Sequence, residues 1–236
     1  KAREHVTVVL TGDGGDEGFC GYDRYRGFAL MRQFSRLGVG SVLRRLFPHP
    51  GPEQRSTRTR AWRFAEALSE SPAKQYSMLM RIYYDEQLEA LAGPELRAAL
   101  AARPDFVAQM VDSFTDKAAA AEKANLCDYA TYLPGDLLVK MDRASMASSL
   151  ETRAPLLDHA VLEFAHALPL GYKMTRRRGK RILRDTFGHL LPPELLSAPK
   201  RGFGVPLGQW LRGPLKGQMT AILSDQSRIA RSGLVA

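Results

Sequence analysis

A short apolar run leads directly into a turn that is rich in both glycine and carboxylates. Residues 6–10 form a compact, β-branched run that predicts a buried strand. The turn from Thr11 to Glu17 then contains three glycines and three carboxylates. Glycines permit positive φ angles and let the backbone approach a ligand closely. Because α/β sheets place ligands where a buried strand leads into a helix, the feature predicts an α/β layered fold with a small-molecule site at this turn.

The carboxylates of this turn, Asp13, Asp16 and Glu17, suit a cation better than an anion. A phosphate would be repelled by them, whereas Mg²⁺ binds through one or two carboxylates and leaves positions for phosphate oxygens. The turn is not a Walker loop, because GxxxxGK[ST] is absent. Spacing alone favours equally an aspartate-rich turn with Asx hydrogen bonds and a helix cap.

The next part of the chain has a helical pattern. A helix is expected near residues 25–37, and a polar, proline-punctuated loop over residues 48–60. Residues 61–121 are rich in alanine and predict several helices. The expected breaks between them are at Pro72, Gly93-Pro94 and Pro104.

The second half of the chain predicts a further series of helices. From Glu122, apolar residues fall at helical spacing until Pro134 stops the run. Asp136 is expected to cap a helix over residues 137–149, and Asp158 one that runs to Leu168. The remaining expectations are a helix with an apolar stripe over residues 182–190, a loop over residues 200–206 and a short helix from Gln209.

The composition excludes several classes of protein. Among the 236 residues are only two cysteines, Cys20 and Cys127, which stand far apart and in no CxxC pattern. Neither a disulfide framework nor a zinc ribbon is therefore expected, and a reducing, cytoplasmic location is favoured. No apolar run approaches the ~18 residues that indicate a membrane span, so no membrane association is expected.

The net charge of +9, from 34 Lys and Arg against 25 Asp and Glu, raises the question of nucleic acid. The basic residues are scattered along the chain, which favours arginines on solvated surfaces. We therefore expect no nucleic-acid partner. A basic, helical nucleic-acid-binding domain is the alternative from another class, and salt-dependent micromolar binding would support it.

A second candidate site is Gly179-Lys180-Arg181 at the start of a predicted helix. Cations in a first turn oppose the helix dipole, at a cost of about 0.3–1 kcal/mol each, and such a breach often marks a function. A lysine there would neutralise the pyrophosphate that leaves a triphosphate. For this segment by itself, a basic surface run continuing from Arg176 is the preferred interpretation.

A third candidate is the charged group Lys140, Asp142 and Arg143 on the helix assigned to residues 137–149. These charges alternate with apolar residues, so some are expected to approach buried surface, where charges need partners. Asp142 is expected to pair with Arg143 or Arg153 in a structural role. Glu151 and Arg153 are likewise expected to form a structural ion pair.

Taken together, several segments resemble the glutamine-hydrolysing asparagine synthetase family. Residues 8–17 (VVLTGDGGDE), with Gly21-Tyr22, resemble the family's strand and signature loop. Residues 132–146 (YLPGDLLVKMDRASM) resemble the family's second signature, and residues 150–158 continue this resemblance. Gly179-Lys180 and residues 199–206 complete the set. The resemblance covers nearly the whole chain, although residues 28–120 match only as helical filler.

The resemblance implies a fold and an activity. The fold is α/β and mostly helical with short parallel strands, a truncated synthetase domain of the adenine-nucleotide hydrolase-like, PP-loop ATP pyrophosphatase type. The activity uses ATP and Mg²⁺ to adenylate the β-carboxylate of aspartate. Ammonia from an upstream glutaminase domain then displaces AMP, which gives asparagine and pyrophosphate. A homodimer is compatible with this assignment.

The resemblance also implies roles for individual residues. Asp16 matches a Mg²⁺ ligand that bridges the phosphates, and Lys180 matches the lysine that stabilises the pyrophosphate and the adenylation transition state. Gly12, Asp13 and Gly14 match the nucleotide and intermediate pocket. Asp13 is also a catalytic candidate, at a position where some members have glutamate. Lys140, Asp142 and Arg143 match motif positions to which the resemblance assigns no fixed role, and they are candidates for the substrate or intermediate pocket.

The family pattern further implies that residues 1–236 are the carboxy-terminal portion of a synthetase domain. It divides them into a signature loop (6–27), a helical segment (28–121) and the second signature with the pyrophosphate lysine (122–212). The family's SGGxDS loop and its amino-terminal cysteine nucleophile are absent from this sequence. We therefore expect these residues to be inactive alone, which asparagine formation by them would contradict. The nearest alternative is adenylation of another carboxylate by a β-lactam-forming or peptide-amidating synthetase.

Overall fold

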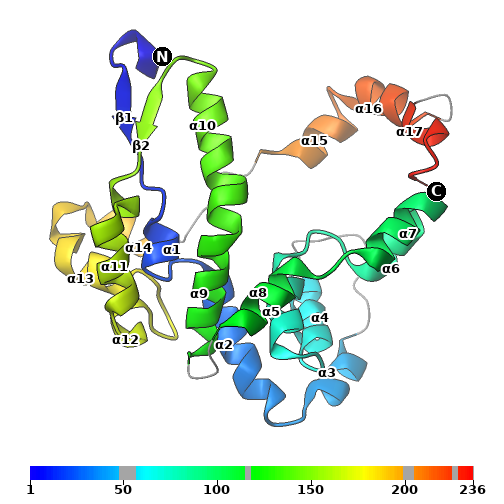
Figure 1. Ribbon diagram of the computed structural model, residues 1–236, viewed down its shortest axis with the longest axis horizontal. Coiled ribbons are helices and arrows are strands. Elements are labelled where there is room, and N and C mark those ends of the chain that lie inside the picture. The colour runs from blue at the N-terminus through cyan, green and yellow to red at the C-terminus, as the bar shows by residue number, and fades with distance from the viewer. Residues whose placement is uncertain (48–56, 115–117, 199–204, 225–227, 236) are drawn as a thin grey trace. The chain divides into compact units, whose positions relative to one another are not determined.

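The computed structural model describes residues 1–47, 57–114, 118–198, 205–224 and 228–235 (Figure 1). The chain divides into two compact units. The first comprises Lys1–Met80 and Asp105–Leu196, and the second comprises Arg81–Pro104 and Ser197–Ala236. The fold is mostly helical with a short parallel sheet, as the sequence predicts.

The first unit holds the sheet and most of the helices. In chain order its elements begin with η1 (Ala2–Glu4), β1 (Val8–Leu10), α1 (Gly15–Gly18), α2 (Asp23–Ser35), α3 (Gly40–Leu46), α4 (Thr57–Ala67) and α5 (Pro72–Met80). They continue with α8 (Phe106–Ser113), α9 (Ala120–Ala130), η2 (Leu133–Leu138), α10 (Val139–Met146), β2 (Glu151–Arg153) and η3 (Pro155–Leu157). The last are α11 (His159–Ala167), α12 (Leu170–Lys173), α13 (Arg181–Phe187), η4 (Gly188–Leu190) and α14 (Pro193–Ser197).

The second unit is helical in its described residues. Its helices are α6 (Asp85–Leu91), α7 (Pro94–Ala102), α15 (Leu207–Arg212), α16 (Lys216–Leu223) and α17 (Arg228–Arg231). Within it, Ala92 and Val235 form an isolated antiparallel bridge, and the Gly93 N–H donates to the Leu234 carbonyl at 2.9 Å. These contacts join the α6–α7 connection to the end of the chain.

Strands β1 and β2 pair in parallel, with Val8 opposite Glu151 and Leu10 opposite Arg153. Because the strands are parallel, the acidic turn after β1 and the chain after β2 leave the sheet at the same end. The sequence predicts a buried strand over residues 6–10. The strand exists, but the prediction of its length and burial is wrong. It covers three residues, and the Leu10 side chain is 73% exposed, because β2 is its only neighbouring strand among the described residues.

The core of the first unit lies between α2, α5, α8 and α9 (Figure 1). On α2, Tyr25, Phe28 and Met31 are spaced by three residues and are buried, so they form one apolar face. The facing side of α9 carries Ala121 and Ala124, which are also buried. Their small side chains let the two helix backbones approach closely.

Most of the predicted helix breaks are confirmed. Helix α2 lies where a helix was expected over residues 25–37, and α5 and α7 begin at Pro72 and Pro94. The loop expected over 48–60 is too long: residues 48–56 lie outside the described part, and α4 begins at Thr57. Thr59 and Trp62 are 2% and 6% exposed, so burial of this helix face outweighs the weak local propensity.

The expected stop at Pro134 is wrong. Helix α9 ends earlier, at Ala130, and Pro134 lies in the first turn of the π-helix η2. Proline is tolerated there because a first-turn N–H has no intrahelical partner. The expected cap at Asp136 is wrong for a related reason. The chain is already helical before α10, and the Asp136 backbone carbonyl accepts from the Val139 N–H.

Other helix ends agree with the sequence. The Asp158 carboxylate accepts a hydrogen bond from the Ala160 N–H at 2.9 Å and caps α11. Helix α13 follows Lys180, and α15 includes Gln209. Most of the loop expected over residues 200–206 lies outside the described residues.

Within the described ranges, no helix is long and apolar enough to cross a membrane.

We expect Met31→Ala to lower the free energy of unfolding by about 2–5 kcal/mol, because it leaves a cavity in the core. Met31 is 0% exposed and packs with Ala67 and Leu68. The matched control is Leu30→Ala on the same helix, whose side chain is 46% exposed. It should cost less than about 1 kcal/mol. Urea unfolding measures both, and equal losses would contradict the assigned core face of α2.

Cys20 and Cys127 are both free and buried, and burial raises the pKa of each thiol to about 11. A raised pKa keeps the thiol neutral, so at pH 8 only about one in a thousand is a thiolate. We expect iodoacetamide at pH 8 to alkylate the folded protein at least about a hundredfold more slowly than the urea-unfolded protein. Mass spectrometry follows both sites, and similar rates would contradict this burial.

Candidate functional site

The acidic turn needs glycine at its centre. Gly14 has φ +86° and precedes the one-turn helix α1. A Cβ atom on Gly14 would lie 2.1 Å from the Cδ2 atom of Leu157, a residue of η3. The turn after β1 therefore packs directly on the chain after β2, which holds the Gly-rich segment at the end of the sheet.

The first aspartate of the turn is held locally. The Thr11 hydroxyl donates to the Asp13 Oδ2 atom at 2.8 Å. Gly12, between these two residues, is exposed, and a Cβ atom added there would meet nothing within 4 Å. The turn is therefore open to a ligand at Gly12, with the half-buried Asp13 carboxylate beside it.

Lys180 reaches the turn from a distant part of the sequence. Its Nζ atom lies 3.2 Å from the Asp16 Oδ1 atom, and the two side chains are 31% and 23% exposed. The same Nζ atom lies 3.5 Å from the position of a Cβ on Gly15. The structure thus brings together the two residues that the sequence singled out in separate motifs. For the segment around Lys180, the sequence favours a run of basic residues on the surface. That interpretation is wrong for Lys180, which is paired with Asp16.

The backbone fixes Lys180 in place. Lys180 precedes α13 with φ +52°, a left-handed conformation that is uncommon for a residue with a Cβ atom. Its N–H donates to the Phe19 carbonyl at 3.0 Å. A Cβ on Gly179 would lie 2.3 Å from the Cys20 carbonyl oxygen. Such conformations cluster at functional sites, and here the strained residue carries the ammonium group to Asp16.

Gly21 lies against both Asp16 and Lys180, a contact that its position in the signature sequence did not predict. A Cβ atom on Gly21 would lie 2.0 Å from Asp16 Oδ1 and 2.5 Å from Lys180 Cε. The Gly21 N–H also donates to the Asp16 carbonyl at 2.8 Å. The Asp16–Lys180 ion pair therefore passes directly over a glycine that has no side chain to block it.

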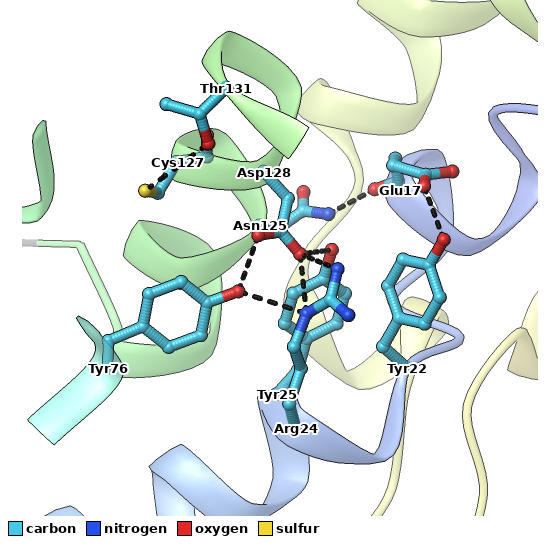
Figure 2. A network of polar contacts seen from close by, with 9 residues as sticks. All are labelled: Glu17, Tyr22, Arg24, Tyr25, Tyr76, Asn125, Cys127, Asp128 and Thr131. Carbon is cyan, nitrogen blue, oxygen red and sulfur yellow. Dashed lines mark hydrogen bonds and ion pairs between the residues drawn. The ribbon is translucent and has the colours of Figure 1, made fainter. Parts of the chain in front are cut away.

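Glu17 differs from the other two carboxylates of the turn. It is 1% exposed, and its Oε1 atom accepts a hydrogen bond from the Tyr22 hydroxyl at 2.6 Å (Figure 2). Burial, and then this hydrogen bond to Glu17, raise the pKa of Tyr22. The Glu17 backbone carbonyl accepts a hydrogen bond from the Asn125 carboxamide. Glu17 therefore points into the fold, whereas Asp13 and Asp16 are the carboxylates with solvent access.

A buried polar network lies beside the turn (Figure 2). The Asp128 carboxylate is 0% exposed and accepts from Arg24 Nε at 2.8 Å and from the Tyr25 and Tyr76 hydroxyls at 2.7 Å. Sequence reasoning missed this network. The signal was two polar residues, Asn125 and Asp128, among the small apolar residues of α9, and a pattern of single residues does not reveal a partner 104 positions away.

The charges of the second signature lie on the surface. Lys140, Asp142 and Arg143 are exposed, and α10 contributes no buried residue. The expectation that some of these charges approach buried surface is therefore wrong. Helix α10 is contacted mainly by η2 and β2 among the described elements, so most of its surface faces solvent.

Within the described part of the chain, Asp142 does not form the ion pair that was expected with Arg143 or Arg153. Arg153 Nε bonds Glu151 Oε1 at 2.7 Å, which confirms the predicted Glu151–Arg153 pair. In the ranges that the structure describes, no ion pair includes Asp142. The three charges of α10 therefore stay candidates for contact with a substrate, on the sequence resemblance alone.

The described residues contain no group of three or more His, Cys, Asp or Glu side chains that could hold a metal by themselves. Mg²⁺ does not require such a group, since it binds through one or two carboxylates together with phosphate oxygens and waters. Asp16, whose side chain is 23% exposed, is a carboxylate with solvent access.

A comparison with protein-family models matches residues 1–236 to "Asparagine synthase". A "Putative asparagine synthetase [glutamine-hydrolyzing]" of Mycobacterium tuberculosis is 35% identical over 218 residues, which is 90% of this chain and 32% of that protein. "Asparagine synthetase [glutamine-hydrolyzing] 1" of Bacillus subtilis is 29% identical over 231 residues, 95% of this chain and 35% of that protein. The chain thus spans about a third of the length of these relatives. A search of the solved structures gave no significant match.

We expect Gly21→Ala to destabilise the fold, because its Cβ would overlap Asp16 and Lys180. Because Asp16 and Lys180 are partly exposed side chains that can shift, the cost should be near the lower end of the range for overpacking, about 1 kcal/mol. Gly27→Ala is the matched control within α2, where a Cβ meets nothing within 4 Å. It should raise the stability by about 0.5–1 kcal/mol, because alanine loses less entropy in a helix. Thermal unfolding measures both, and a neutral Gly21→Ala would contradict the close ion pair.

Proposed function

Because the chain belongs to the asparagine synthase family, we propose that it carries the carboxylate-activating part of an ATP-dependent asparagine synthetase. In this reaction a carboxylate oxygen of the aspartate side chain attacks the α-phosphorus of ATP, and the bond to pyrophosphate breaks. Ammonia, delivered by a glutaminase domain, then attacks the acyl carbon of the adenylate. Asparagine forms, AMP leaves, and a proton is released.

The Asp16–Lys180 pair is the observation that supports this proposal. An ammonium group and a carboxylate lie 3.2 Å apart in a glycine-rich turn where the sheet ends. Adenylation transfers negative charge to the leaving pyrophosphate, and a fixed cation at that point stabilises the transition state more than the ground state. Lys180 is the residue we assign to this role, because the Phe19 carbonyl and the Gly179 contact hold it in place.

The donor set of the turn fits a Mg²⁺ ion that is shared with ATP. Asp16 is partly exposed and carries a carboxylate oxygen beside Lys180, which agrees with the one or two carboxylates that Mg²⁺ takes from a protein. Asp16 would hold the ion. When bound, Mg²⁺ would neutralise phosphate charge and orient the triphosphate.

The neighbouring residues suit the rest of the nucleotide and the intermediate. Gly12 leaves the backbone open, so a ligand can approach it closely. Gly14 holds the turn against Leu157. Asp13, oriented by Thr11, is the carboxylate we assign to the reacting centre, where it would orient the attacking ammonia and accept its proton. Lys140, Asp142 and Arg143 would line the approach of substrate.

The test is exchange of labelled pyrophosphate into ATP by the protein expressed from its natural start to its natural stop. We expect exchange to require aspartate and Mg²⁺. Lys180→Ala and Asp16→Asn should each lower its rate by about 10²–10³-fold, as loss of a charge-stabilising group does. The control is Lys74→Ala, which removes an exposed lysine paired with Glu70 and should leave exchange unchanged.

Each of two results would contradict one part of the proposal. Exchange that Lys180→Ala leaves intact would remove Lys180 from the reaction. Exchange that aspartate does not support, but another carboxylate does, would replace the substrate and keep the adenylation chemistry.

A further inference from the structure

Helix α9 presents two buried polar side chains to the segment that carries the acidic turn. Asn125 and Asp128 stand three residues apart on the same face of the helix, and they are 1% and 0% exposed. Asn125 donates through its carboxamide nitrogen to the Glu17 backbone carbonyl (Figure 2). This contact joins positions that are 108 residues apart in the sequence.

The contact matters because α1 is only four residues long. The last carbonyls of a helix have no partner within it, and a helix of one turn has no interior that could hold them. The Asp16 carbonyl accepts from the Gly21 N–H at 2.8 Å. The Glu17 carbonyl accepts instead from Asn125, so a side chain of α9 completes the end of α1.

Asp128 reaches the same turn by a second route. It holds Arg24, whose guanidinium carbon lies 3.8 Å from the centre of the Tyr22 ring. The Tyr22 hydroxyl then donates to the Glu17 carboxylate at 2.6 Å. Helix α9 therefore fixes both the main chain and the side chain of Glu17, the residue next to Asp16.

Lys180 depends on the same short stretch of chain. Its N–H is bonded to the Phe19 carbonyl, and Gly179 packs on Cys20 and Gly21. Both members of the Asp16–Lys180 pair are thus attached to residues 16–21. Whatever fixes this stretch fixes the distance between the carboxylate and the ammonium group.

We infer that α9 positions the acidic turn for the reaction, and that Asn125 is the positioning residue that sets Asp16 against Lys180. Asn125 itself contacts no reacting atom. Its catalytic consequence rests on the proposed function, because a carboxylate displaced by about 1 Å would hold Mg²⁺ and the triphosphate less well. Its structural consequence, an ordered turn, does not rest on that function.

The test compares two isosteric variants, one within α9 and one at the residue that follows it, each of which loses one hydrogen bond from a side chain to a carbonyl. Asn125→Leu removes the bond to Glu17. Thr131→Val removes the 2.7 Å bond from the Thr131 hydroxyl to the Cys127 carbonyl, within the same helix region. Thr131→Val is the matched control, because it affects α9 without touching the turn.

The first measurement is hydrogen exchange at the Gly18 and Gly21 amides, in the full-length protein. These amides donate to the Gly14 and Asp16 carbonyls at 2.7 and 2.8 Å. We expect both to exchange at least about tenfold faster in Asn125→Leu, as local opening becomes easier, and at the wild-type rate in Thr131→Val. Unchanged exchange in Asn125→Leu, or equal acceleration in both variants, would overturn the inference.

The second measurement is the Mg²⁺ concentration that half-saturates pyrophosphate exchange. We expect Asn125→Leu to raise it about tenfold, as poorer positioning of a ligand carboxylate does, and Thr131→Val to leave it unchanged. A loss of folded protein alone would lower the rate and leave this midpoint where it is, and that result would overturn the catalytic part. If the wild-type protein exchanges nothing with any carboxylate, the proposed function fails while hydrogen exchange still decides the positioning.

If Asn125→Leu does not fold, Tyr22→Phe tests the second route by which α9 fixes the turn, from Asp128 through Arg24 and Tyr22 to Glu17. It removes the hydroxyl that donates to Glu17 and keeps the ring that stacks on Arg24. Faster exchange at Gly18 and Gly21, with a raised Mg²⁺ midpoint, is expected again. Wild-type behaviour in both measurements would overturn the inference that α9 positions the turn through Tyr22.

Discussion

The buried carboxylate of Asp128 is the interaction on which the first unit depends. A charge taken out of water is stabilising only when hydrogen bonds and an opposite charge offset its desolvation. Here one oxygen accepts from Arg24 and Tyr25 and the other from Tyr76, so the carboxylate is satisfied by groups of α2 and α5. Removing one partner of such a pair typically costs about 3–5 kcal/mol, a large part of the 5–15 kcal/mol or so of a whole domain.

Close contact between backbone segments positions the Asp16 and Lys180 side chains beside this core. Glycines at positions 14, 21 and 179 sit where a Cβ would overlap a neighbouring residue. They allow three segments, the acidic turn, the chain after β2 and the lysine segment, to pack against each other at the end of the sheet. The ion pair between Asp16 and Lys180 is thus set by the backbone as much as by the side chains.

Local features of the chain were predicted well, and features that depend on distant contacts were not. The helix starts at Pro72 and Pro94 and the Asp158 cap follow from the chemistry of a few adjacent residues. The helical conformation at Pro134 does not follow from local chemistry. A proline in the first turn of a helix and a proline that ends a helix cannot be distinguished from the neighbouring residues. Similarly, Glu17 could not be told from Asp13 by pattern, since its burial comes from Tyr22 and α9.

By itself, the sequence determined the mostly helical class, the acidic glycine-rich turn and the identity of Asp16 and Lys180 as candidates. The helical class and the turn are properties of composition and short spacing, whereas the roles expected of Asp16 and Lys180 came from the resemblance to a known family. Only the tertiary structure decided that Lys180 meets Asp16, that a Cβ on Gly21 would overlap this pair, and that Asn125 and Asp128 hold the turn. The physical reason is that hydrogen bonds and ion pairs act over a few ångströms, and only folding brings residues more than a hundred positions apart within that distance.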